Sequence, residues 1–180
     1  MRCRLTTSVS GLADKVSFMI GDAENIPFPD SSFSHVWSMN MFYHIPDKAI
    51  TFKEFARVIE AGGTLAFDDW VITEKTTSAE HERLRQKWQN PWFGTLAEYV
   101  GFMKDAGLHI EKLLDLSPVG SILMPKYFKC VFESYFKPRI LELFPRFGLQ
   151  IANSLLKDIM YTVQLYQEGK FAYYQLCARK

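Results

Sequence analysis

Short apolar runs alternate with a helix-like segment in the first half of this chain, and this alternation restricts the fold it can adopt. Residues 16–20, 33–39 and 64–67 are apolar runs of strand length. Between the last two, apolar residues recur at helical spacing over residues 50–59, after Asp47, which can cap a helix start. Strands that alternate with helices are typical of an α/β fold with a parallel sheet.

The rest of the chain continues the alternation. We expect the helix after Asp47 to end at Gly62-Gly63, and a charged, exposed helix or excursion to follow over residues 73–89. A helix over 96–107, stopped by Gly107, and a strand over 109–116 come next. Residues 118–167 are aromatic and helical in character. We expect breaks in that helical region near Pro125, Pro138 and Pro145. Residues 171–180 are predicted to form the last strand.

Composition excludes several classes of protein. The 21 basic and 20 acidic residues leave a formal charge of +1, which gives no electrostatic reason to expect a nucleic-acid partner. Three cysteines far apart in the sequence suggest neither a disulfide framework nor a metal site, so we expect no metal and a reducing, cytoplasmic setting. No apolar stretch has the length of a membrane span, and the first residues lack the apolar core of a secretion signal.

Polar side chains follow each apolar run. Asp22 comes after the first run, Asn40 after the second and Asp68 after the third. Ligands of open parallel sheets bind beyond the carboxyl ends of the strands, so these positions are candidates for a binding site.

Several motifs, in order, resemble a known family. They are Gly-Asp22-Ala-Glu-Asn-Ile-Pro-Phe-Pro, Trp37-Ser, His44-Ile-Pro-Asp47, Phe52-Lys-Glu-Phe-Ala-Arg and Gly62-Gly63-Thr-Leu. Their order is similar to that of the class I S-adenosylmethionine-dependent methyltransferases that act on small molecules, and within these to the sarcosine and dimethylglycine methyltransferases. The match is firm over residues 11–68. It implies S-adenosylmethionine as the cofactor and methyl transfer to a nitrogen, oxygen or carbon nucleophile of a small molecule.

The resemblance also implies roles for single residues. Asp22 would accept a hydrogen bond from the adenine amine while the Ala23 amide donates to the ring, although Asp22 could instead cap a turn. The expected cofactor-binding residues are Asp22, Ala23, Ser38, Met39 and Asn40, of which Met39 could equally be a core residue. The expected substrate-binding residues are Asn40, Asp68, Trp70, Trp92 and Phe93. The aromatic residues among them could hold a cationic amine or bury an apolar ring.

His44 is the candidate catalytic residue, because an imidazole at a strand end could remove a proton from a substrate nucleophile. It could also only hydrogen-bond the loop that starts the next helix. A second set of aromatic residues could form either the core of a helical cap or a substrate-binding site, and we favour the core. They are Tyr127, Phe128, Phe132, Tyr135, Phe136, Phe144 and Phe147.

One departure from the family matters. The family binds the methionine part of its cofactor on a Gly-rich turn after its first strand, and no Gly-x-Gly occurs in this sequence. The strands of the family's sheet have the order 3-2-1-4-5-7-6, in which residues 16–20 would be strand 3. Strands 1 and 2 lie between strand 3 and strand 4 in that order, and they have no counterpart in this sequence. Residues 16–20 would then lack a neighbour, unless residues 5–9 act as a substitute strand.

We therefore expect a partial Rossmann-like α/β sheet of the class I methyltransferases with a helical cap and with the first two family strands absent. Its parts would be the C-terminal part of the core over residues 1–117, a cap insertion over 118–168 and the last core strand over 169–180. The chain would be incomplete, and a partner would supply the missing strands, or it would form a homo-oligomer.

Two other classes of function stay open. The chain could be a catalytically inactive, methyltransferase-like binding or regulatory subunit. A nucleotide-dependent oxidoreductase needs the same missing Gly-rich turn and does not explain the motifs around Asp22 and Asp47. A hydrolase is disfavoured because no Gly-x-Ser-x-Gly elbow is present.

Overall fold

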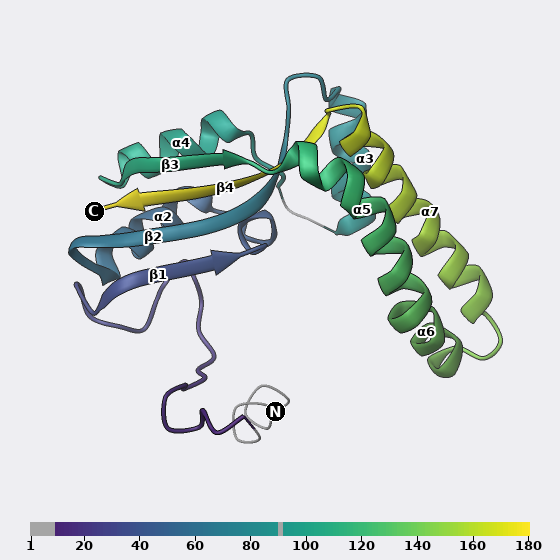
Figure 1. Cartoon of the computed structure of the whole chain (residues 1–180), viewed down its shortest axis with the longest axis horizontal. Helices are drawn as coiled ribbons and strands as arrows, with labels where there is room; N and C mark the ends of the chain where they lie inside the picture. Colours follow the sequence, from purple (N-terminus) through teal and green to yellow (C-terminus); the bar gives the residue numbers. More distant parts are fainter. Residues whose placement is uncertain (1–9, 90–91) are drawn as a thin grey trace.

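The computed structural model describes residues 10–89 and 92–180, and within them four strands form one open sheet (Figure 1). The strands are β1 (Phe33–Met39), β2 (Ile59–Ile72), β3 (His109–Asp115) and β4 (Phe171–Arg179), and their order across the sheet is β1-β2-β4-β3. β1 and β2 are parallel, whereas β4 is antiparallel to both of its neighbours. This is the order 4-5-7-6 that the resemblance predicts, so the expected partial sheet is confirmed.

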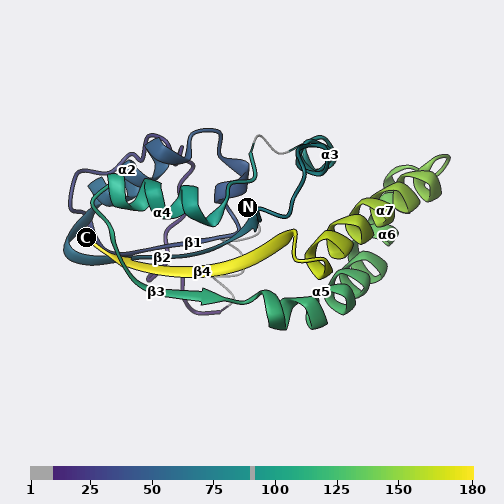
Figure 2. The ribbon, with the colours of Figure 1, turned by 90° about the horizontal axis from the view of Figure 1, so that it is seen from above.

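Two helices cover one face of this sheet. Figure 2 shows α2 (Lys48–Val58) and α4 (Leu96–Asp105) on the same side of the strands. As predicted, the Asp47 side chain caps α2 by accepting a hydrogen bond from the Ile50 amide at 2.9 Å. The main core lies between these helices and the strands and is rich in aromatic residues, with the Phe42 and Phe52 rings stacked at 4.4 Å.

The remaining helices extend beyond one end of the sheet (Figure 1). We call the helices between β3 and β4 the helical arm: α5 (Ser117–Val131), the π-helix η2 (Phe132–Phe136), α6 (Lys137–Leu143) and α7 (Gly148–Gln167). A separate helix, α3 (Ser78–Trp88), follows β2. None of the helices in the described ranges is long and apolar enough to cross a membrane.

Proline has different effects at three positions of the arm. Pro138 lies in the first turn of α6 and Pro145 lies between α6 and α7, so both mark helix boundaries as predicted. Pro125 lies inside α5, and the predicted break there is wrong. Proline removes only its own backbone donor, and the turns on either side of it keep the helix continuous.

The predicted end of the first helix at Gly62-Gly63 is also wrong. α2 ends at Val58, and β2 begins at once and runs through both glycines to Ile72, well beyond the predicted run of residues 64–67. Between two successive pairings, β1 advances from Phe33 to His35 while β2 advances from Ile59 to Thr64. The glycines therefore form an irregularity within a strand, of the kind that glycine permits, instead of a helix stop.

Residues 16–20 do not form the expected strand. They have no strand pairing in the described part of the chain, and Ile20 is 99% exposed. Figure 1 shows this segment running away from the sheet below β1. An isolated extended segment gains no ladder hydrogen bonds, which explains why the apolar run alone does not produce a strand. The possible substitute strand at residues 5–9 lies outside the described residues.

Candidate functional site

A cavity of about 270 Å³ lies where the carboxyl ends of β1 and β2 meet α3 and the helical arm. Its lining is mostly aromatic, and none of the described lining residues is charged. The lining residues are Asn40, Tyr43, Trp70, Trp88, Phe93, Met124, Tyr127, Phe128, Thr162 and Phe171.

Asn40 forms the end of the cavity nearest β1. Its backbone is left-handed, with φ at 49°, a conformation that asparagine tolerates better than most residues. Its backbone N–H donates to the Asp68 carbonyl at 3.1 Å and to Asp68 Oδ1 at 3.2 Å. These bonds hold the residue that follows β1 against β2. The turn leads into the short helix η1 (Phe42–His44), from which Tyr43 reaches the cavity.

Stacked rings make up the wall next to the sheet. Trp70 and Phe171 stack at 5.2 Å with their planes 6° apart, and Tyr43 and Phe93 stack at 5.8 Å. Phe93 meets Phe171 edge-on at 5.2 Å and joins the two pairs. Because Phe171 pairs with Ile72 across the ladder, the first residue of β4 lies at the carboxyl end of β2.

The opposite wall comes from helices distant in sequence. Met124, Tyr127 and Phe128 of α5 lie at helical spacing and face the cavity together. Trp88 Nε1 donates to Thr162 Oγ1 at 2.9 Å and joins the end of α3 to α7. These five residues were not predicted as site residues. The spacing of the α5 residues was a usable signal, whereas nothing in the sequence relates Trp88 to Thr162.

The predicted cap aromatics divide into three groups. Tyr127 and Phe128 line the cavity, and Phe132 is buried in a small core of the arm. The other four are exposed: Tyr135, Phe136, Phe144 and Phe147.

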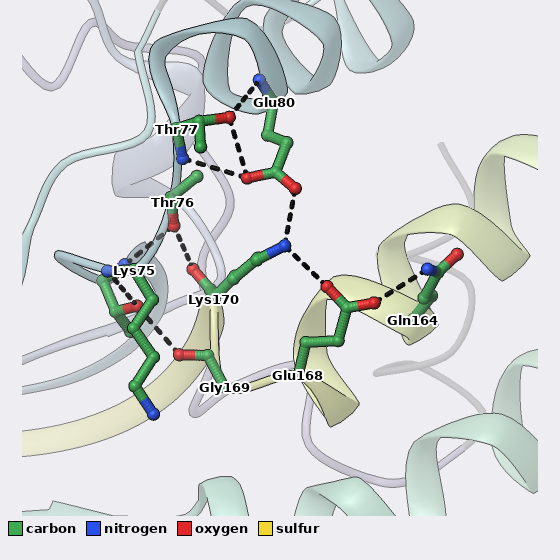
Figure 3. Close-up of polar contacts among 9 residues, drawn as sticks. Lys75, Thr76, Thr77, Glu80, Gln164, Glu168, Gly169 and Lys170 are labelled. Atoms are coloured by element: carbon green, nitrogen blue, oxygen red, sulfur yellow. Dashed lines mark hydrogen bonds and ion pairs between the residues drawn. The ribbon is translucent and has the colours of Figure 1, made fainter.

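A polar junction holds the base of the arm against the sheet (Figure 3). Lys170 Nζ lies 2.7 Å from both Glu80 Oε1 and Glu168 Oε2, and the Thr76 hydroxyl donates to the Lys170 carbonyl. The bond from Lys170 lowers the pKa of Glu80 to about 2, and Glu80 also forms a capping box with Thr77. The junction joins the start of α3, the end of α7 and the residue before Phe171, and so fixes where the walls of the cavity meet.

Two neighbouring carboxyl groups of β2 have different surroundings. Asp68 Oδ1 accepts from the Tyr173 hydroxyl at 2.6 Å. Asp69 is 1% exposed and accepts from the Tyr99 hydroxyl at 2.8 Å. Burial raises the pKa of Asp69 to about 7, against the effects of Tyr99 and the nearby Lys48. Burial also lowers the pKa of Lys48 to about 8.

Of the predicted substrate residues, Asn40, Trp70 and Phe93 line one cavity, and Asp68 is hydrogen-bonded to the first of them. Trp92 lies apart from the lining residues, with its ring 5.2 Å from that of His81. The predicted catalytic residue His44 is exposed and is not among the lining residues, and its ring lies 4.1 Å from that of Tyr43, which lines the cavity.

The predicted cofactor residues lie at the end of β1 and in a turn before it. Asp22 is exposed and accepts a hydrogen bond from the Glu24 amide at 2.9 Å, as a turn-capping residue does. Glu24 in turn accepts from the Asp47 amide at 2.9 Å, which fixes the turn containing Ala23 beside the start of α2. In β1, Ser38 is buried, and its hydroxyl has no hydrogen-bond partner among the described residues. Met39 points to the opposite face and is 62% exposed.

Comparisons with known proteins confirm the resemblance. A family model described as a methyltransferase domain matches residues 2–67. The chain is 34% identical to 27-O-demethylrifamycin SV methyltransferase of Amycolatopsis mediterranei over 107 residues, which are 58% of this chain and 39% of that protein. The chain thus spans well under half of that relative.

Solved structures show the same fold. The structure of a "putative sarcosine dimethylglycine methyltransferase" from Galdieria sulphuraria matches 99% of this chain and 64% of its own, with a TM-score of 0.81 and 22% identity. A geranyl diphosphate methyltransferase in complex with SAM matches 98% of this chain and 62% of its own, with a TM-score of 0.76 and 15% identity. At these identities the likeness establishes the fold and not the activity.

Proposed function

We propose that this chain, which has the fold of the class I methyltransferases, contributes the acceptor-binding part of an enzyme that transfers a methyl group from S-adenosylmethionine to a small molecule. The observation that carries the proposal is the aromatic cavity at the carboxyl ends of β1 and β2. This is the position at which open α/β sheets bind ligands, and the turn proposed for the cofactor is bonded to Asp47 at the start of α2.

The residues present fit one side of the cofactor. Asp22 is exposed at its turn, Ser38 has a buried hydroxyl without a partner among the described residues, and Asn40 reaches the cavity. With Ala23 and Met39 they are the residues we propose to hold the adenosine. When bound, the cofactor supplies an electrophilic methyl group. The Gly-rich turn that holds its methionine part in the family has no counterpart in this sequence.

The residues of this chain would act mainly by orienting the acceptor. The aromatic walls would exclude water and hold the acceptor in one orientation, and Asn40 would fix a polar group at one end. An amine acceptor needs no base. For a hydroxyl or carbon acceptor, His44 and Asp68 are the proposed bases, and Asp68 is already hydrogen-bonded by Tyr173.

A second candidate function is that of a catalytically inactive binding or regulatory subunit, which the missing Gly-rich turn favours. In either case the free edge of β1 could receive strands from a partner. Cysteine usage further supports a cytoplasmic setting as part of this proposal.

Calorimetric titration with S-adenosylhomocysteine separates the two functions. For a methyltransferase we expect saturable heat that Asp22→Ala abolishes and that Asp14→Ala, which removes an exposed carboxylate elsewhere in the N-terminal segment, leaves unchanged. The absence of heat at concentrations that saturate methyltransferases would instead support the binding subunit.

A further inference from the structure

The chemical character of the acceptor can be inferred from the cavity. Its described lining offers aromatic and aliphatic surface together with a few neutral polar groups, and no ionised side chain. Transfer of a charged ligand into such surroundings loses hydration without the gain of a counter-charge.

Asp68 and Asp69 are sequence neighbours of lining residues, but their carboxyl groups bind other parts of the protein. Asp68 Oδ1 accepts hydrogen bonds from the Tyr173 hydroxyl and from the Asn40 backbone N–H. Asp69 is buried and engaged by Tyr99 and by the Trp70 amide, and neither aspartate lines the cavity.

Four of the lining rings are also poorly arranged for a cation. An aromatic box binds an ammonium group through free ring faces. Here Phe171 stacks on Trp70, and the Tyr43 ring is close to those of Phe93 and His44, with ring centroids 5.8 Å and 4.1 Å away. These ring faces contact one another and are therefore not available to a cation. The remaining surface suits an apolar ligand better than a cation.

One lining atom is a hydrogen-bond acceptor left without a partner. Asn40 Oδ1 is buried and unpaired among the described residues. The Tyr173 hydroxyl and the Asn40 backbone N–H both donate to Asp68, so neither of these donors occupies Asn40 Oδ1. A buried acceptor without a donor is costly, and a ligand hydroxyl or N–H group would remove that cost.

We propose that the cavity binds an uncharged, largely apolar molecule that carries one hydrogen-bond donor, held by Asn40 Oδ1. This inference rests on the proposed methyl transfer and decides between the two acceptor chemistries that the aromatic residues alone leave open.

Three bicyclic probes of similar size test this inference in calorimetric titrations of the chain. They are 2-naphthol, which has a donor; 2-methoxynaphthalene, which has none; and 2-naphthylmethylamine, which is cationic at neutral pH. We expect 2-naphthol to bind about five- to tenfold more tightly than the methoxy probe, as one hydrogen bond allows, and the amine to bind most weakly.

Asn40→Gly removes the acceptor without straining the left-handed backbone, and it should make the two neutral probes bind equally. Ser31→Gly is the matched control, because Ser31 is also left-handed, with φ at 55°, and does not line the cavity. Tighter binding of the amine, equal binding of the neutral probes to the unmodified chain, or no binding of any probe would overturn the inference.

These titrations need neither cofactor nor turnover. A chain that prefers 2-naphthol but does not bind S-adenosylhomocysteine would contradict the proposed function, whereas a chain that binds the cofactor product but prefers the amine would contradict this inference alone.

Discussion

At residue 69 a carboxyl group is buried within β2. The Tyr99 hydroxyl and the Trp70 amide hydrogen-bond it, yet burial raises its pKa to about 7 because desolvation penalises the charged form more than these bonds favour it. In the unfolded chain the same group titrates near its ordinary value of 3.8. The folded protein therefore keeps a proton at residue 69 that the unfolded chain loses.

This difference makes stability depend on pH in a defined direction. Below about pH 4 both states are protonated and Asp69 imposes no penalty. Between about pH 4 and 7 only the unfolded chain ionises, so the contribution of Asp69 to the free energy of unfolding falls as the pH rises. We expect Asp69→Asn, which imitates the protonated acid, to stabilise the protein by on the order of 2–4 kcal/mol at pH 8 and by little near pH 4.

Urea unfolding of both proteins across this range measures the effect. Asp105→Asn is the control, since Asp105 is exposed at the end of α4, and it should change stability little at any pH. If Asp69→Asn were destabilising at pH 8, Asp69 would have to be ionised and stabilised by Lys48.

Single residues also show how far the sequence predicts the site. Asn40 and Trp70 were identified because each follows a predicted strand end, and Phe93 because it lies in the connection that covers the substrate in the resembled family; all three line the same cavity. Trp88 and Thr162 escaped prediction because their contact depends on how α3 packs against α7, a long-range arrangement that local patterns do not encode.

At the scale of elements, caps were more predictable than strand lengths. Asp47 starts α2 as predicted, because N-capping is a local hydrogen bond. Gly62-Gly63 was interpreted as a helix end, yet it lies within β2, because pairing with β1 and β4 extends that strand in both directions. The apolar run at residues 16–20 shows the converse, since without a paired neighbour it forms no strand.

The irregularity in β2 leads to a prediction for Gly63. A Cβ atom there would lie 2.7 Å from the Ser34 carbonyl oxygen and 2.7 Å from Ile59 Cγ2. Since one of these atoms belongs to the backbone of β1, the clash would have to move a strand, and we expect Gly63→Ala to cost about 1–3 kcal/mol.

Gly101→Ala is the matched control within α4. Apart from its chain neighbours and the backbone of its own helix, no described atom lies within 4 Å of the added methyl group, and alanine favours a helix over glycine by about 0.5–1 kcal/mol. In thermal unfolding, the melting temperature should thus fall for Gly63→Ala and rise for Gly101→Ala. Equal shifts would show that the close approach of β2 to β1 is not as described.

At the scale of the whole molecule, the sheet has one face against the main core and β1 as an edge strand. α2 and α4 lie on the same side (Figure 2), and among the described residues β1 pairs with β2 alone, so its outer edge is free. Trp37 is 72% exposed on β1, and Met39, 62% exposed, lies on the same face of that strand, opposite the main core. A free strand edge beside exposed apolar side chains is suited to pairing with another chain.

We therefore expect the isolated chain to self-associate through β1. Trp37→Lys places a charge beside the free edge and should weaken the association by about tenfold or more, since a buried interface tryptophan is worth roughly 2 kcal/mol. Sedimentation velocity over a range of concentrations measures this. Leu143→Lys is the comparison, because Leu143 is similarly exposed but lies in the distant helix α6. If Leu143→Lys weakened the association and Trp37→Lys did not, the contact would lie on the helical arm, and the edge of β1 would remain free to receive strands from a different partner.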